Sequence, residues 1–286
     1  MIVSVSRRTD VPALYSDWLF NRIRAGWAEA RNPRTKAAIR VSLLQEDVDG
    51  IVFWTKNPAP MLERLHELKA YAYYFQFTLT PYGSDVEPNV LDKMEAVIPT
   101  FKALSEAVGA DRVIWRCDPI MVSPKYSLEY HVRAFAKIAK ELHQHTQKVI
   151  ISFIDQQYHS VGARLKHLNP VEITEYLQFS IALQLAPIAK DRGMQIETCA
   201  ETTDLSQFGI GHARCVDKDL FERMLNRPLN VGKDRGQRSY CGCATSIDIG
   251  TYNTCTNGCL YCYANTSART VERNRGRYDP MLPHLC

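Results

Sequence analysis

Three cysteines near the carboxyl end of the chain have a spacing that suits a metal cluster. Cys255, Cys259 and Cys262 lie within eight residues, in the string Cys-Thr-Asn-Gly-Cys-Leu-Tyr-Cys. Thiolates this close in sequence can bind separate irons of one cubic cluster. A 4Fe-4S cluster commonly has four cysteine ligands, so three would leave one iron open, as a catalytic zinc site keeps one position open. A zinc knuckle that uses two or three of these thiols is the competing interpretation.

The chain has nine cysteines, and all but Cys117 lie in its last third. In a reducing compartment such a set favours metal binding or catalysis over disulfides. Four of them suggest a second metal site, for zinc or an auxiliary iron–sulfur cluster: Cys199, Cys215, Cys241 and Cys243. Buried thiols without a metal are the alternative. Cys117 and Cys286 are expected to be unpaired. Cys117 is expected to pack in the core, and a thiol that faces the substrate is the alternative.

Composition and charge are those of an ordinary soluble globular protein. Hydrophobic residues make up 45% and charged residues 23% of the 286 residues. The net charge of +4 is small for a protein that binds nucleic acid. The first residues lack the apolar region of a secretory signal, and no apolar run reaches the ~18 residues of a membrane helix. We expect a cytoplasmic protein without a membrane partner, and nucleic acid is not favoured as a partner but stays open.

Short apolar segments alternate with segments of helical periodicity. Strands are predicted at 2–6, 50–55, 73–80, 112–116, 148–154, 194–200 and 246–250. Helices are predicted at 14–27, 61–68, 91–108, 128–142 and within 162–192. Strands separated by helices indicate an α/β fold with parallel pairing through right-handed crossovers. A partial or full (β/α) barrel is favoured over an open doubly wound sheet, because no GxGxxG follows a strand.

Polar residues gather where the predicted strands end, which is where a (β/α) barrel carries its site. They are Arg7 to Asp10, Thr55, Lys56, Thr78, Thr80, Arg116, Asp118, Asp155, Cys199 and Glu201. The charged residues 7–10 could recognise an anionic substrate, and a salt-bridged rim is the alternative.

The cysteine motif, with an aromatic residue before its third cysteine, resembles the signature of radical S-adenosylmethionine (SAM) enzymes. Its continuation into Tyr263-Ala264 is similar to the spore photoproduct lyase-like branch. Three further segments resemble elements of that branch: Thr55-Lys56, Phe77 to Thr80 with the Glu87-Pro88 turn, and Arg116 to Ile120. The resemblance covers most of the chain, and the cysteine motif is its most specific part.

One difference from typical radical SAM enzymes concerns the place of the motif, which there lies near the amino end. The resemblance therefore implies a circularly permuted partial or full (β/α) radical SAM barrel, as in a bacterial family whose CxxxCxxC motif lies at the carboxyl end. Residues 1–286 would form one domain. Its cluster-binding strand and loop would span 244–265, and a cysteine-containing insert would span 199–243.

The resemblance also implies cofactors and roles. A 4Fe-4S cluster on the three motif cysteines would cleave SAM reductively and give a 5′-deoxyadenosyl radical, with electrons from a donor such as a flavodoxin or ferredoxin. Tyr261 would lie near the adenine, Lys56 and Arg116 would pair with the SAM carboxylate, and Thr78 and Thr80 would meet the ribose. A structural ion pair for the two cations, and ordinary strand propensity for the two threonines, are the alternatives. The substrate is not indicated.

A different class of function is a non-catalytic zinc or iron–sulfur protein, including a nucleic-acid-binding or repair module. Metal content and reactivity toward SAM distinguish it from the enzyme.

Overall fold

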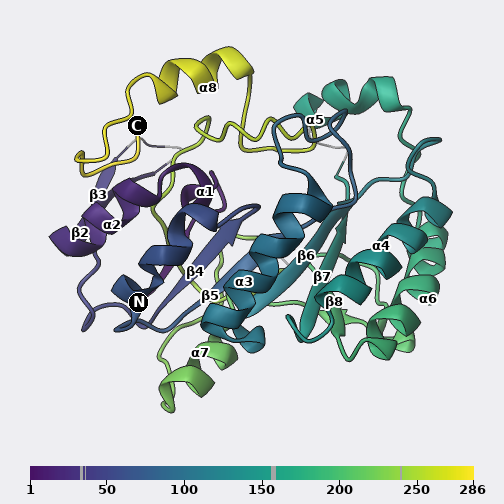
Figure 1. Ribbon diagram of the computed structural model, residues 1–286, viewed down its shortest axis with the longest axis horizontal. Helices are drawn as coiled ribbons and strands as arrows, with labels where there is room; N and C mark the ends of the chain where they lie inside the picture. The colour runs from purple at the N-terminus through teal and green to yellow at the C-terminus, as the bar shows by residue number, and fades with distance from the viewer. Residues whose placement is uncertain (33–34, 36, 156–158, 239) are drawn as a thin grey trace.

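The computed structural model describes residues 1–286 apart from 33–34, 36, 156–158 and 239. Within these residues the chain forms a sheet of eight strands in the order β10-β1-β4-β5-β6-β7-β8-β9 (Figure 1). All neighbouring strands in it are parallel. A separate antiparallel hairpin joins β2 to β3.

The bounds of the strands are as follows: β1 (Ile2–Val5), β2 (Trp27–Arg31), β3 (Ala38–Ser42), β4 (Gly50–Thr55), β5 (Tyr73–Thr78), β6 (Val113–Ile120), β7 (Lys148–Phe153), β8 (Gln195–Thr198), β9 (Gly211–His212) and β10 (Ile247–Asp248). The α-helices are α1 (Val11–Leu14), α2 (Ser16–Ala25), α3 (Ile98–Val108), α4 (Leu128–Leu142), α5 (His159–Leu165), α6 (Glu175–Asp191), α7 (Lys218–Leu225) and α8 (Ala268–Arg275). Four short 3-10 segments (Ala59–Leu68, Ala110–Arg112, Lys166–Leu168 and Ser206–Phe208) and one π turn (Lys93–Val97) complete the described elements.

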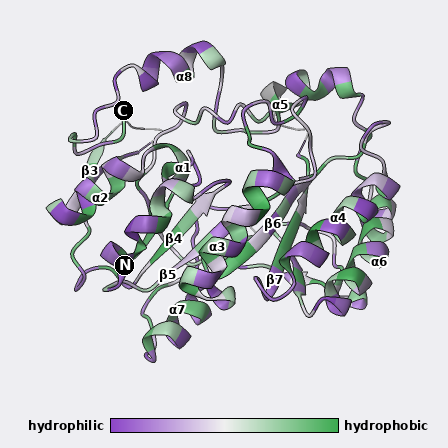
Figure 2. Ribbon diagram, viewed as in Figure 1, coloured by the Kyte–Doolittle hydropathy of each residue, from purple (hydrophilic) through white to green (hydrophobic). Residues whose placement is uncertain are grey.

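Both faces of the sheet are covered by apolar packing, because successive side chains of a strand point to opposite faces. One face carries Phe53 and Trp115, which pack with the flanking helices in the larger core cluster. The other face carries Val52, Tyr74 and Ile114, which pack against residues 213–244, including α7. Figure 2 shows the result: the strands are mostly hydrophobic, and the outer helices carry hydrophilic sides.

The carboxyl-terminal segment lies across one end of the sheet. β10 pairs in parallel with β1 through Val3–Ile247 and Ser4–Asp248. The residues after β10 then pass over the upper ends of the strands in Figure 1, opposite the end at which β1 begins. The cysteine motif therefore reaches the carboxyl ends of the parallel strands although it comes last in the sequence.

The parallel α/β sheet and all seven predicted strands are confirmed. The predicted helix at 14–27 is wrong at its end, because Gly26 adopts a left-handed conformation (φ 75°) that stops α2, and Trp27 begins β2. The sequence prediction also missed α1, β2, β3, β9, α7 and α8.

Closure of the sheet into a barrel is not seen among the described residues. The edge strands β9 and β10 have two residues each and share no strand pairing in this part of the chain. The helices of the described residues include none that is both long and apolar enough to span a membrane.

Candidate functional site

A cavity of about 670 Å³ opens at the carboxyl ends of the strands. The charged and polar residues predicted at the strand ends line it, with Thr80 as the exception. Thr80 is fully buried and donates to Glu87 instead. The structure therefore brings the polar residues of the strand ends together in one cavity.

The three motif cysteines also line this cavity, on a loop that several elements hold in place. Tyr15, between α1 and α2, donates to the Thr254 carbonyl at 2.6 Å, just before the motif. Within it, the Leu260 amide donates to the Val86 carbonyl at 2.9 Å. Arg164 of α5 binds the carbonyls of Leu260 (2.9 Å) and Cys262. Contacts from three separate elements thus fix the loop against the sheet.

Gly258, inside the motif, has a backbone conformation that other residues rarely adopt. Its φ is +69°, and a Cβ atom there would lie 3.0 Å from Cγ of Pro88. Glycine is favoured at such positions because it lacks the Cβ that causes strain. The Asn257-Gly258 turn therefore lets the loop pass close to the Glu87-Pro88 turn.

Asp248 connects the strand that precedes the motif to the end of β1. Its carboxylate accepts from Ser4 Oγ (2.9 Å), Ser6 Oγ (2.6 Å) and the Arg7 amide (2.8 Å). These bonds extend the short β10–β1 pairing beyond its two residue pairs. The first and last parts of the chain are thereby joined at the cavity.

Asp10 connects three further elements beside the motif. It caps α1 by accepting from the Ala13 amide (3.1 Å), accepts from the Lys56 amide at the end of β4 (2.7 Å), and accepts from Asn257 Nδ2 (3.2 Å). Burial raises the pKa of this carboxyl group. Asp10 is a positioning residue that holds Lys56 and the motif loop together.

Glu87 is the centre of a buried charge cluster that the sequence did not single out as a site residue. It accepts from Lys56 Nζ and Thr80 Oγ1, both at 2.7 Å, and from the Tyr261 hydroxyl and Lys93 Nζ. Burial alone would raise its pKa, but Lys56 and Lys93 lower the pKa to about 2. Two of the predicted SAM-binding residues are thus brought together: Lys56 Nζ lies 5.6 Å from the centre of the Tyr261 ring.

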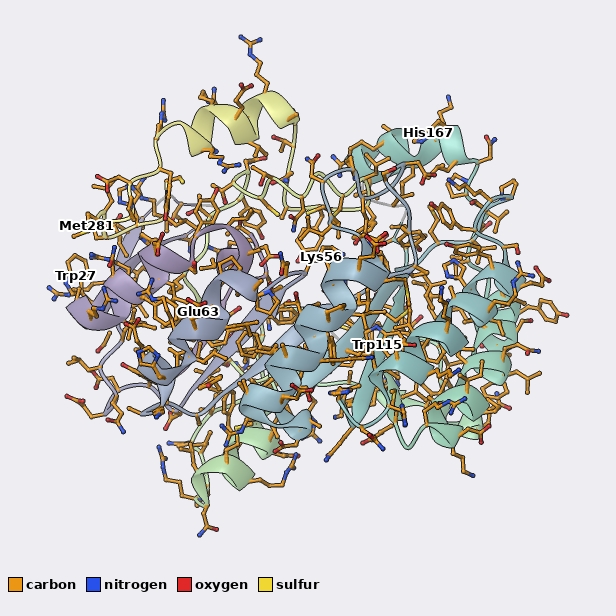
Figure 3. All side chains as sticks on the ribbon, viewed as in Figure 1. Trp27, Lys56, Glu63, Trp115, His167 and Met281 are labelled. Atoms are coloured by element: carbon orange, nitrogen blue, oxygen red, sulfur yellow. The ribbon has the colours of Figure 1, made fainter. Side chains whose placement is uncertain are left out.

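Arg116 lies on another wall of the cavity and is already engaged. Its Nε donates to Asp118 Oδ1 at 3.0 Å, its Nη2 binds Asp118 Oδ2, and its Nη1 donates to Cys215 Sγ at 2.8 Å. The ion-pair alternative is therefore what the structure places at Arg116, and Lys56, labelled in Figure 3, has such a partner in Glu87. Thr78 lines the cavity beside Arg116.

Arg7 is a cavity residue with a side-chain atom that finds no partner. Its Nη2 is buried and makes no hydrogen bond among the described residues. The guanidinium group lies 5.3 Å from the centre of the Trp54 ring, and that of Arg116 lies 5.2 Å from it. An unpaired buried donor is costly, so Arg7 is suited to receive an anionic group of a bound molecule.

The second set of cysteines is also brought together by the fold. Cys199 Sγ lies 3.2 Å from Cys215 Sγ. The Cys243 thiol contacts those of both Cys215 and Cys241. All four thiols line the same cavity as the motif.

The other two cysteines lie apart from these groups. Cys117 is buried in the core, 4% exposed, as expected. Cys286 is a half-buried free thiol.

Most thiols of both groups have a raised pKa, which in the second group holds for Cys199, Cys215 and Cys243. Burial raises the pKa of Cys259 to about 12, and it also raises the pKa of Cys255 and Cys262. A hydrogen bond with Cys243 lowers the pKa of Cys241 to about 7. A bound metal ion would hold such thiols in the thiolate form.

Three thiols on one loop are a donor set that fits an iron–sulfur cluster or zinc. As they stand, the described residues include no group of three or more His, Cys, Asp or Glu side chains placed so that it could hold a metal ion. Metal binding would therefore require the thiols to rotate.

Fold and site together define an α/β protein with a thiol-rich cavity at the carboxyl ends of a parallel sheet. The chain belongs to the family described as a domain of unknown function, DUF1848, whose model matches residues 2–264. That match includes both groups of cysteines. No curated protein matches the chain.

Proposed function

We propose that this protein is a radical SAM enzyme that carries a 4Fe-4S cluster on Cys255, Cys259 and Cys262. The observation that supports this most is the convergence of the three-thiol loop, Lys56 and Tyr261 on one cavity. The parallel pairing of β10 with β1 supports a circularly permuted partial barrel, because β10 leads into the motif and lies beside the first strand of the chain.

The cluster would supply one electron to SAM bound at its open iron, which yields methionine and a 5′-deoxyadenosyl radical that takes a hydrogen atom from the substrate. The electron would come from a flavodoxin or ferredoxin. The residues of the chain position the reactants and limit their contact with water.

Individual residues have distinct parts in this proposal. Tyr261 presents an aromatic ring to the cavity, held by its hydroxyl contact with Glu87. Lys56 supplies a positive charge beside that ring, and Arg7 supplies the unpaired donor for a carboxylate or other anion. Arg116 is bound to Asp118 and Lys56 to Glu87, so we assign the SAM carboxylate to Arg7, whose Nη2 has no hydrogen-bond partner among the described residues.

The proposal is tested by reconstituting the protein anaerobically with iron and sulfide, adding dithionite and SAM, and measuring 5′-deoxyadenosine by chromatography. We expect 5′-deoxyadenosine from the wild type and none above background from Cys259→Ala. Cys117→Ala is the matched control, since it removes a core thiol away from the cavity, and it should keep the activity. A folded wild type that binds no iron after reconstitution and does not cleave SAM would overturn the enzyme and favour a non-catalytic metal protein.

A further inference from the structure

Four thiols outside the motif form a second donor set on the cavity wall. We propose that Cys199, Cys215, Cys241 and Cys243 bind one zinc ion as four thiolates. This inference is independent of the proposed function, because it involves none of the motif cysteines.

The four described thiols would have to shift to bind an ion, but the spacing of Cys199 and Cys215 favours a single ion over a cubic cluster. In a tetrahedral zinc site with Zn–S distances of about 2.3 Å, neighbouring sulfurs lie about 3.8 Å apart. The Cys199 and Cys215 sulfurs are 3.2 Å apart, so they need to separate by only about 0.6 Å around an ion of this geometry. In a 4Fe-4S cluster each cysteine binds a different iron, which places the ligand sulfurs farther apart.

Two guanidinium groups lie beside the four thiols. Arg116 is 6% exposed and directs Nη1 at the Cys215 sulfur from 2.8 Å. A neutral thiol is only a weak acceptor for such a donor, whereas a thiolate is a charge-assisted one. Arg7 lies on the same side, within electrostatic range of Cys215 and Cys243. Two guanidinium groups therefore compensate the negative charge that four thiolates keep after binding a divalent ion.

Backbone contacts hold two of the ligand segments together without help from a metal. The Val216 amide donates to the Cys243 sulfur at 3.3 Å, and the Ala244 amide donates to the Val216 carbonyl at 2.9 Å. Hydrogen bonds to ligand atoms are typical of the surroundings of metal sites, where they orient the ligands.

The position of these cysteines gives the ion a structural role. The Cys215 carbonyl accepts from Tyr74 and Gln76 of β5, so this thiol lies over the central strands of the sheet. An ion bound by all four thiols would tie the connections that follow β8 and β9 to the segment that precedes β10. Removing it should lower stability as well as open the cavity wall.

The experiment measures zinc and iron per chain in protein purified without oxygen. We expect about one zinc ion in the wild type and less than about 0.2 in Cys241→Ser/Cys243→Ser, with zinc retained in Cys259→Ser and Cys117→Ser. Circular dichroism checks that each variant is folded. Cys259→Ser changes only the motif, so it should lose iron and keep zinc. The iron content therefore tests the proposed enzyme, and the zinc content tests the zinc site separately.

A second measurement uses the unaltered protein, so it does not depend on the folding of a variant. X-ray absorption at the zinc edge should show a shell of four sulfurs at about 2.3 Å. A shell of nitrogen or oxygen would overturn the proposal. A zinc-free protein with a Cys199–Cys215 disulfide would also overturn it. Loss of iron from the Cys241→Ser/Cys243→Ser variant would show an auxiliary iron–sulfur cluster in place of zinc.

Discussion

Replacement of Glu87 by glutamine tests how the cavity holds its charges. The variant keeps the shape of the side chain but removes the negative charge that Lys56 and Lys93 share. The Glu87 side chain is fully buried, so the two ammonium groups would lose their partner inside the protein. Breaking a buried ion pair by removing one member costs about 3–5 kcal/mol.

The pKa of Glu87 gives an independent magnitude. It falls from 4.5 to about 2 on folding, and at about 1.4 kcal/mol per pKa unit this corresponds to about 3 kcal/mol. Because the pKa is lower in the folded protein, the stabilisation is fully present above pH 4.5 and is lost as the pH falls toward 2. The wild type and the variant should therefore differ less in their free energy of unfolding at pH 4 than at pH 7, by about 1 kcal/mol.

The assay is urea and thermal unfolding of the wild type and Glu87→Gln at pH 7 and pH 4, followed by circular dichroism. We expect the variant to melt about 5 °C lower at pH 7, since about 1 kcal/mol shifts the Tm of a chain this long by about 2 °C. Glu106→Gln, an exposed change on α3, is the matched control and should have no effect. If Glu87→Gln lowers the free energy of unfolding by less than about 1 kcal/mol, or by an amount that does not depend on pH, the buried charge cluster is refuted.

Three further changes probe the site and its surroundings. Gly250→Ala would place a Cβ 2.1 Å from Ser6 Oγ. We therefore expect the free energy of unfolding in urea to fall by about 1–3 kcal/mol and the protein to bind less iron. Full iron loading with unchanged stability would contradict the close β10–β1 junction. Cys117→Ala should lower the free energy of unfolding by about 1 kcal/mol and leave the iron content in elemental analysis unchanged. A lower iron content would place this thiol in the site. Tyr261→Phe removes the hydroxyl that donates to Glu87 and should lower the unfolding free energy by about 2 kcal/mol; an unchanged value would show that this contact does not contribute.

The sheet could be predicted because its strands are apolar on both faces and short enough to be distinguished from helices. Residues 50–55 and 128–142 were predicted with the bounds of β4 and α4. The β2–β3 hairpin was missed, because its strands carry mixed exposed and buried residues with little apolar signal. β9 is an exposed strand of two residues, which no periodicity can reveal.

The candidate site was predictable where chemistry is local in sequence and less so where the fold creates it. The motif cysteines stand out by spacing alone. The convergence of Cys199, Cys215, Cys241 and Cys243 depends on two strand ends and a long connection, so the sequence could only suggest it. The role of Glu87 was missed because its partners Lys56 and Tyr261 come from distant segments, although a glutamate before Pro88 was a visible signal.

The proposed radical SAM chemistry is tested most directly by electron paramagnetic resonance of the anaerobically reconstituted and reduced protein, recorded with and without SAM. We predict the signal of a reduced 4Fe-4S cluster that changes when SAM is added, and no such signal in Cys259→Ala. A cluster signal that SAM leaves unchanged, or no cluster signal in a folded wild-type protein, would contradict the proposal.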